Sequence, residues 1–245
     1  MKIMTIKSCG STNESVKELI FQMKDPSPLP PALMALEQTS GKGRSGRSFE
    51  SLRGKGLYLS MPFEIRSPED ALCIMPMTSV CVCRTLEALL PFRCQIKWPN
   101  DLLYDGRKLC GILTELVQHR KRFFIVIGIG INLTQEKDDF SEELRDKAVS
   151  LRQICGKSID PQTLAEALVP SVEKMIKALP DGKAGYLNFY RSRCTAVGRE
   201  ISVLFSESSQ PVKARAIDIS DDFRLMVQWD DGRTGMHGSG EVSIR

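Results

Sequence analysis

The order of apolar and polar positions along the chain predicts a large helix-and-strand portion followed by a strand-rich tail. Apolar side chains at spacings of three and four predict a first helix over residues 12–23, and Ser11, Thr12 and Asn13 can cap its start. A proline in the first turn opens a long apolar helix at residue 68. Further helices are predicted over 161–178 and up to 193, and strands over 31–37, 57–61, 95–98 and 122–133.

The tail, from about residue 196 onward, has a different texture. Short apolar stretches alternate with turns rich in Ser, Asp and Gly, which is typical of a small β-barrel. We therefore predict an α+β domain over residues 1–193 and a small β domain over residues 194–245.

Composition leaves room for these two units. The 245 residues are 42% hydrophobic and 26% charged, which is enough for a sizeable core. No uninterrupted apolar run approaches ~18 residues, and residues 1–10 lack the features of a signal peptide. The expected location is therefore the cytoplasm, with no membrane partner. The eight cysteines include no C-x-x-C pair and are predicted to be reduced core thiols.

Positive charge is concentrated in residues 41–55, which we call the ribbon. This segment carries five basic residues, one acidic residue and four glycines, so its excess (five minus one) equals the net charge of +4 of the whole chain. The sequence pI of about 8.6 is low for a protein that attracts nucleic acid with its whole surface, which favours a local anion site. A solvated, disordered loop is the alternative interpretation.

The glycines of the ribbon do not form a dinucleotide-binding motif. Residues 41–46 match the pattern G-x-G-x-x-G, but that motif requires a helix to follow, and Gly54 and Gly56 disfavour one. A Walker motif is also absent from the sequence. What remains is a mobile loop that can close over an anion with arginine side chains and backbone N–H groups. Phe49, the single aromatic residue of the ribbon, could stack on a flat ring or fix the loop to the core.

A second set of polar residues surrounds a predicted hairpin that turns at Asp105-Gly106. Lys97, Asn100 and Asp101 lie where the preceding strand ends, and Lys108 enters the following apolar strand. A lysine in such a place can meet a carboxylate or phosphate, and Asp101 can hold Mg²⁺. Together, these groups indicate a polar site beside an apolar hairpin.

The predicted strand over residues 122–133 contains Gly128 and Gly130, which leave space for a ligand or for close packing of another backbone. Asn132 places an amide at its end. The sequence contains no nucleophile elbow and no histidine-rich or paired-cysteine metal motif, so triad hydrolysis and zinc chemistry have little support. Lysines, arginines, amides and one aspartate suit phosphoryl or nucleotidyl transfer.

Five motifs together resemble those of the biotin protein ligases. They are S-T-N at 11–13, E-Q-T-S-G-K-G-R-S-G-R at 37–47, K-W-P-N-D at 97–101, R-K-L-C-G-I-L at 107–113 and G-I-G-I-N-L at 128–133. The closing G-E-V-S-I-R resembles the end of that family's SH3-like C-terminal domain. The resemblance covers essentially the whole chain. It implies a mixed β-sheet catalytic domain of the class II aminoacyl-tRNA-synthetase-like fold, followed by a small SH3-like β-barrel.

The resemblance also implies an activity. Such an enzyme activates biotin with MgATP to biotinyl-5′-AMP and then acylates one lysine of a biotin carboxyl carrier protein or domain. Some relatives carry an N-terminal DNA-binding domain, but only ten residues precede the S-T-N motif, so we expect a short form without DNA as a partner. A homodimer is compatible with the resemblance.

Residue roles implied by the resemblance fall into four groups. The biotin-binding residues are Ser11, Thr12, Asn13, Gln38, Gly41, Lys42, Gly43, Arg44, Lys108, Gly111, Gly128 and Gly130. The residues that bind ATP and the adenylate are Arg44, Arg47, Phe49, Lys97, Asn100 and Asn132. The catalytic groups are Lys108, Lys97 and Arg44, and Asp101 would lie near Mg²⁺. The ribbon would act as a lid that orders over the adenylate.

Two departures from the family pattern affect the ribbon. Lys42 stands where the family usually has arginine, which removes a bidentate donor, and Phe49 replaces the usual tryptophan with a smaller stacking face. Two other functions stay open. One is lipoate or octanoyl transfer on the same core, and the other is a non-catalytic module that binds RNA through the ribbon and peptides through the tail.

Overall fold

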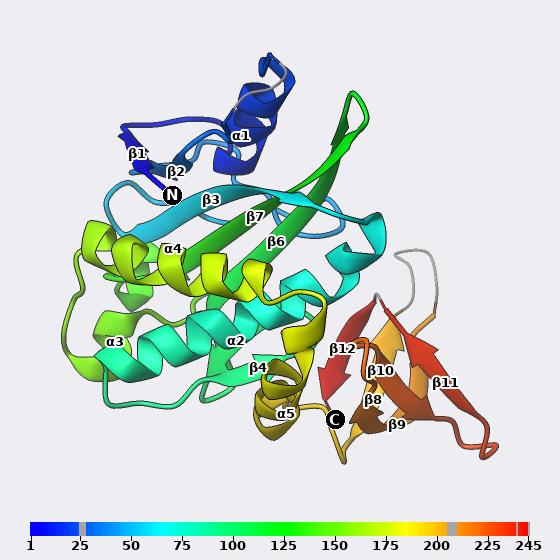
Figure 1. The fold of residues 1–245 in the computed structure, drawn as a ribbon. Helices are drawn as coiled ribbons and strands as arrows, with labels where there is room; N and C mark the ends of the chain where they lie inside the picture. Colours follow the sequence, from blue (N-terminus) through cyan, green and yellow to red (C-terminus); the bar gives the residue numbers. More distant parts are fainter. Residues whose placement is uncertain (25–27, 205–209, 239, 245) are drawn as a thin grey trace.

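Among the described residues, seven strands form a mixed sheet that carries most of the chain (Figure 1). The computed structural model describes residues 1–24, 28–204, 210–238 and 240–244. The strands are β1 (Ile3–Ile6), β2 (Ala32–Ala35), β3 (Gly56–Ile65), β4 (Gln95–Lys97), β5 (Asp101–Tyr104), β6 (Arg107–His119) and β7 (Arg122–Asn132). They lie in the order β1-β2-β3-β7-β6-β5-β4, with β1 and β2 parallel and the other neighbours antiparallel. The predicted α+β class is confirmed.

Helices cover both faces of this sheet. The helices are α1 (Thr12–Phe21), α2 (Ala71–Leu89), α3 (Leu151–Cys155), α4 (Pro161–Lys177) and α5 (Ala184–Arg193). In Figure 1, α2 and α4 lie side by side on one face, where they contact each other and the strands β6 and β3. On the other face, Val16 and Ile20 of α1 pack with Leu33 and Phe124 of the sheet. The helical spacing of apolar residues in α1 therefore identifies its buried side.

Helix α2 is the central core helix. Ser67 caps the turn that precedes it and accepts a hydrogen bond from the backbone N–H of Glu69 at 3.3 Å. The segment Pro68–Leu89 is long and apolar enough to cross a membrane by length and composition alone, although polar residues interrupt its apolar run as the sequence showed. Because 67% of its apolar window is buried inside the protein, α2 is accounted for as a core helix.

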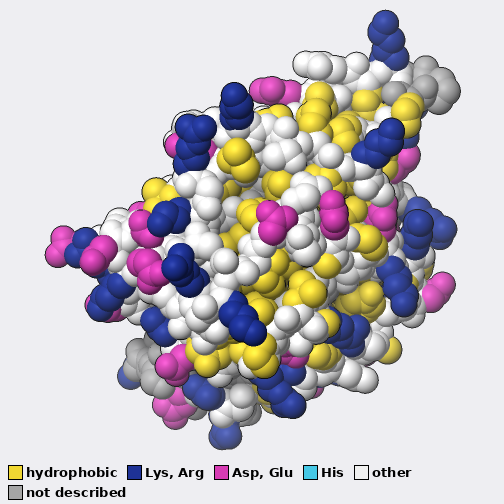
Figure 2. Space-filling view, turned by 90° about the vertical axis from the view of Figure 1, so that its left-hand side faces the viewer, with side chains coloured by type: hydrophobic (Ala, Val, Ile, Leu, Met, Phe, Trp, Pro, Cys, Tyr) yellow, Lys and Arg dark blue, Asp and Glu magenta, His cyan; other side chains and the backbone are white. Residues whose placement is uncertain are grey.

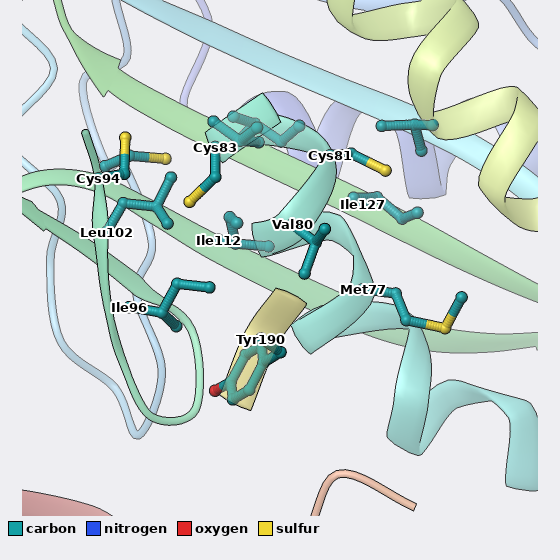
Figure 3. Packing of buried hydrophobic residues seen from close by; sticks show 14 of the residues in the cluster. Met77, Val80, Cys81, Cys83, Cys94, Ile96, Leu102, Ile112, Ile127 and Tyr190 are labelled. Carbon is teal, nitrogen blue, oxygen red and sulfur yellow. The ribbon is translucent and has the colours of Figure 1, made fainter. Parts of the chain in front are cut away.

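The cysteines belong mainly to this core. All eight are free, and five of them are buried. Figure 3 shows Cys81 and Cys83 of α2, together with Cys94, among Ile127 and other aliphatic side chains. Burial raises the pKa of the Cys81 thiol to about 11, so this group is uncharged and packs as a small apolar side chain.

The remaining strands form a second, antiparallel sheet. They are β8 (Glu200–Leu204), β9 (Val212–Ile219), β10 (Leu225–Gln228), β11 (Thr234–His237) and β12 (Glu241–Ile244), in the order β11-β10-β9-β8-β12. The predicted change to short strands in the tail is confirmed. Val203 and Val242 join the same buried cluster as Trp98 of the larger unit, and Trp98 Nε1 donates to the carbonyl oxygen of Phe223 at 3.2 Å. The two sheets therefore share one continuous apolar core.

Candidate functional site

The start of α1 does not use the side-chain cap that its sequence predicts. Ser11 occupies the N-cap position with extended backbone, but its side chain makes no capping hydrogen bond. Thr12 and Asn13 lie inside the helix and are buried, and their side chains bond to Gln38 and to the sheet instead. The predicted cap is therefore wrong, because neighbouring elements provide better partners for these polar groups.

Ser60 and Gln38 connect Thr12 and Asn13 to the sheet and to the ribbon. Ser60 Oγ, fully buried in β3, lies 2.7 Å from Thr12 Oγ1 and 2.6 Å from Asn13 Oδ1. Gln38 Oε1 accepts from both the backbone N–H and the hydroxyl of Thr12, at 2.8 and 3.0 Å. Gln38 Nε2 in turn donates to Ser51 Oγ at 2.8 Å. These bonds fix a row of polar side chains against one face of the sheet.

The first part of the ribbon is folded as a small hairpin. Ser45 and Gly46 form its tip with φ values of 53° and 71°, a left-handed pair typical of tight turns. Behind the tip, Gly43 N–H donates to the Arg47 carbonyl at 2.7 Å, and Phe49 N–H donates to the Gly41 carbonyl at 2.9 Å. The glycines thus serve a turn, and the hairpin aims Phe49 at the sheet.

Phe49 occupies the space above two of the glycines assigned to a ligand. A Cβ added at Gly130 would lie 2.7 Å from Phe49 Cε1, and one added at Gly111 would lie 3.3 Å from Phe49 Cε2. A Cβ at Gly128 would lie 2.3 Å from Asn13 Oδ1. All three glycines also line the cavity described below, and that they give a ligand room stays a prediction. In this structure they make room for side chains of the chain itself.

A β-bulge directs Lys108 toward the same place. The β5–β6 hairpin turns at Asp105-Gly106 as predicted, but the register shifts by one residue so that Leu109 is extra on β6. Such a bulge redirects the neighbouring side chain. Lys108 Nζ lies 2.8 Å from Asp101 Oδ1 and 5.9 Å from the centre of the Phe49 ring. The lysine is thus held between a carboxylate and an aromatic face.

A cavity of about 60 Å³ lies where these elements meet. Its lining residues are Ser11, Thr12, Asn13, Gln38, Lys42, Gly43, Arg44, Phe49, Asn100, Lys108, Gly111, Ile112, Leu113, Gly128, Ile129 and Gly130. Arg44 and Lys108 therefore share one cavity, as their assignment to a common site requires. A guanidinium nitrogen of Arg44 donates to Asn100 Oδ1 at 3.3 Å and to the Gly240 carbonyl at 3.5 Å, so the ribbon also contacts the small sheet unit.

The structure does not bring every predicted residue to this cavity. Gly41 lies just outside, where a Cβ would meet the Phe49 carbonyl oxygen at 2.4 Å. Arg47 lines a second cavity of about 440 Å³ next to the first, together with Lys42, Arg44 and Glu115. Lys97 lines neither cavity.

Asn132 has a structural task that its motif did not reveal. Its buried amide donates to the carbonyls of Lys108 and Val149 at 3.3 and 3.1 Å, and its Oδ1 accepts from Gln135 at 3.2 Å. It therefore supports the strand that carries Lys108 and does not line the cavity.

Charges around the ribbon are paired. Hydrogen bonds from Lys17 and Lys42 lower the pKa of Glu14. Burial disfavours the charged form of Lys17, yet hydrogen bonds to Glu115 and Glu14 outweigh it and raise its pKa. On the face drawn in Figure 2, Lys and Arg side chains are interspersed with Asp and Glu.

Sequence reasoning missed four residues around the cavity, namely Glu14, Lys17, Ser60 and Glu115. One sequence feature indicated Ser60, because a serine is a small polar side chain among the apolar residues in the middle of β3. No sequence pattern marked Glu14, Lys17 or Glu115, because a single charged residue on a helix or at the edge of a sheet is usually a solvated surface residue. Within the described ranges, no group of three His, Cys, Asp or Glu side chains is arranged to hold a metal ion.

Comparison with known proteins places the chain in a family. The model of the biotin/lipoate A/B protein ligase family matches residues 6–132. The bifunctional ligase/repressor BirA of Bacillus spizizenii is 36% identical over 91% of this chain and 68% of its own length. The biotin–[acetyl-CoA-carboxylase] ligase of Mycobacterium tuberculosis is 30% identical over 86% of this chain and 77% of its own length.

A solved structure agrees with these sequence relatives. The biotin protein ligase of Aquifex aeolicus, in complex with biotin and ATP, superposes with a TM-score of 0.81 at 27% identity, covering 100% of this chain and 98% of that one. The sequence match, the fold and the shared cavity agree, and the chain belongs to the biotin/lipoate A/B protein ligase family.

Proposed function

We propose that this chain is a biotin protein ligase, which activates biotin with ATP and transfers it to a lysine of a carrier protein. The observation that carries the proposal is the single cavity into which the start of α1, the ribbon and β6 all project. Neutral polar groups (Thr12, Asn13) and cationic groups (Arg44, Lys108) line the same space. Relatives named as biotin ligases, and a similar structure that holds biotin and ATP, support these substrates.

The chemistry consists of two transfers with the same electrostatic demand. In the first, a carboxylate oxygen of biotin attacks the α-phosphorus of ATP, the bond to the β-phosphate oxygen breaks and pyrophosphate leaves. In the second, a lysine amine of the carrier attacks the acyl carbon and loses a proton, the acyl C–O bond breaks and AMP leaves. Negative charge develops on phosphate oxygens, so Arg44 and Lys108 are proposed to stabilise both transition states.

The remaining lining residues suit the uncharged parts of the substrates. Thr12, Asn13 and Gln38 offer hydroxyl and amide groups for the polar ureido ring of biotin. Asn100, already bonded to Arg44, is proposed to lie near the nucleotide. Arg47 in the second cavity is proposed to meet the outer phosphates of ATP.

Ligand binding on this scheme requires the Phe49 ring to move. A site for a small molecule usually encloses roughly 300 Å³ or more, whereas the cavity beside Phe49 measures about 60 Å³. Phe49 must therefore leave its place over Gly130 when the substrates enter. Its ring is then proposed to stack on adenine, so the ribbon acts as a lid.

Mg²⁺ would arrive with ATP as part of the substrate. Such an ion usually keeps several waters and binds substrate phosphates with one or two protein carboxylates. Asp101 can supply one carboxylate, although Lys108 already pairs with it. We therefore assign Asp101 a shared role toward Lys108 and the metal. The carrier is proposed to be a biotin carboxyl carrier domain in the cytoplasm, and the catalytic unit is proposed to end at residue 193.

Pyrophosphate release tests the function. Purified protein with ATP should release pyrophosphate when biotin is added and should label a carrier domain with biotin. Release that depends on lipoate instead would favour lipoate transfer. A protein that releases no pyrophosphate with either acid, but binds RNA with a steep dependence on salt, would be the binding module.

A further inference from the structure

Four charged side chains link the ribbon to the wall of the cavity. Lys42 Nζ pairs with Glu14 of α1, and Glu14 Oε1 also accepts from Lys17 Nζ at 2.8 Å. Lys17 Nζ donates to Glu115 Oε1 on β6 at 2.8 Å, and Glu115 Oε2 accepts from Asn13 Nδ2 at 2.7 Å. Positive and negative groups alternate along this row, so each charge has an opposite neighbour.

Both ends of this row line the cavity. Asn13 belongs to α1, and its Oδ1 lies 2.6 Å from Ser60 Oγ of β3. Lys42 belongs to the ribbon and lines both the first cavity and the larger one beside it. Glu14 is the member of the row that contacts the ribbon, and it belongs to a helix that packs on the sheet.

The exposed fractions of the charged side chains show which ion pair of the row is most easily broken. The side chain of Lys17 is only 18% exposed and keeps Glu115 as a partner if Glu14 is lost. Lys42 is 50% exposed and would lose the ion pair that ties it to α1. Neutralising Glu14 therefore frees the outer side of the ribbon while the link between α1 and β6 persists.

We propose that Glu14 is a positioning residue for the ligase reaction, which holds the ribbon closed through Lys42 and so slows the escape of the mixed anhydride. This inference rests on the proposed function, because it concerns how long biotinyl-5′-AMP stays bound. It also explains why lysine suffices at position 42, since the partner is a single carboxylate on a neighbouring helix and a point charge can meet it.

Retention of the adenylate is the direct test. Protein loaded with biotin and ATP is freed of excess substrate by rapid gel filtration, and the loss of bound biotinyl-5′-AMP is followed over time. Glu14→Gln should lose it about two- to fivefold faster, the effect expected of one partly exposed ion pair. Glu18→Gln removes the same charge from an exposed position of the same helix and should behave like the wild type. Salt should speed the loss from the wild type more than from Glu14→Gln.

Two further measurements separate positioning from general destabilisation. Trypsin cleavage after Arg44 or Arg47 in the ligand-free protein should be faster for Glu14→Gln, while its urea midpoint should match that of Glu18→Gln. The double variant Glu14→Gln/Lys42→Gln should open the ribbon to trypsin no further than Lys42→Gln alone, because both changes break one contact.

The outcomes distinguish the inference from the function on which it rests. The role of Glu14 would be overturned if Glu14→Gln retained the adenylate and resisted trypsin as well as the wild type. It would also be overturned if a lowered urea midpoint of Glu14→Gln accounted for both changes. A wild-type protein that releases no pyrophosphate with biotin would refute the proposed function instead. Trypsin cleavage would then still decide whether Glu14 holds the ribbon.

Discussion

Gly130 lies directly beneath the Phe49 ring, so a single added methyl group tests how the closed ribbon is built. In Gly130→Ala the new Cβ would lie 2.7 Å from Phe49 Cε1 and 2.8 Å from Cζ. Carbon atoms pack best at roughly 3.5–4.0 Å, so the ring must move. Because the backbone of Phe49 is bonded to Gly41, moving the ring strains or lifts the hairpin.

The expected cost follows from this overlap. Forcing one extra methyl into a packed site usually costs about 1–3 kcal/mol. Since about 1.4 kcal/mol is a factor of ten, the closed ribbon should become roughly 5- to 140-fold less favoured against the open one. We expect Gly130→Ala to lower the free energy of unfolding of the ligand-free protein by up to that cost and to open its ribbon to trypsin. Urea unfolding and the rate of trypsin cleavage after Arg44 or Arg47 measure the two effects.

A double-mutant cycle isolates the contact. In a Phe49→Ala background the ring is gone, so Gly130→Ala should cost nothing or stabilise the strand slightly. Gly185→Ala is the matched control, because a Cβ there meets nothing within 4 Å. If Gly130→Ala has the same effect with and without the Phe49 ring, the ring does not rest on Gly130 and the account of the ribbon fails.

Three further predictions concern other parts of the molecule. Lys108→Ala should slow biotin labelling of a carrier domain by about 10²- to 10³-fold, the loss expected for one group that stabilises developing charge. Arg224 hydrogen-bonds to Asp222 and lowers its pKa from 3.8 to about 2. Because the folded pKa is the lower one, the stability that Asp222 adds is full well above pH 3.8 and is lost as pH falls toward 2, so the difference in unfolding free energy from Asp222→Asn should shrink on acidification. Trp98→Phe should cost about 1–3 kcal/mol in urea unfolding, because the buried carbonyl of Phe223 loses its donor.

Each of these has a result that contradicts it. Labelling by Lys108→Ala at the wild-type rate would remove that lysine from the reaction. A difference between wild type and Asp222→Asn that is constant from neutral pH to pH 2 would contradict the lowered pKa. Unchanged stability of Trp98→Phe would mean that water or another donor replaces the indole.

Local sequence patterns predicted most of the helices and strands because they act through neighbours along the chain, whereas β1 and α3 were not predicted. The Asp105-Gly106 turn formed as predicted, since both residues tolerate the left-handed backbone that a tight hairpin needs, with φ values of 49° and 73°. Apolar spacing found α1 and its buried face. The predicted cap at Ser11 failed, because capping competes with tertiary partners that local patterns do not contain.

The sequence by itself also determined the family and a cavity shared by Arg44 and Lys108, because several motifs at fixed spacing are specific even when each alone is weak. Only the tertiary structure decided that Phe49 covers Gly130, that Asn132 supports the backbone of Lys108, and that Lys42 pairs with Glu14. Those contacts join residues far apart in the chain. They depend on the strand order, on the bulge at Leu109 and on which side chain fills a given space. Such long-range geometry produces no periodic pattern in the sequence.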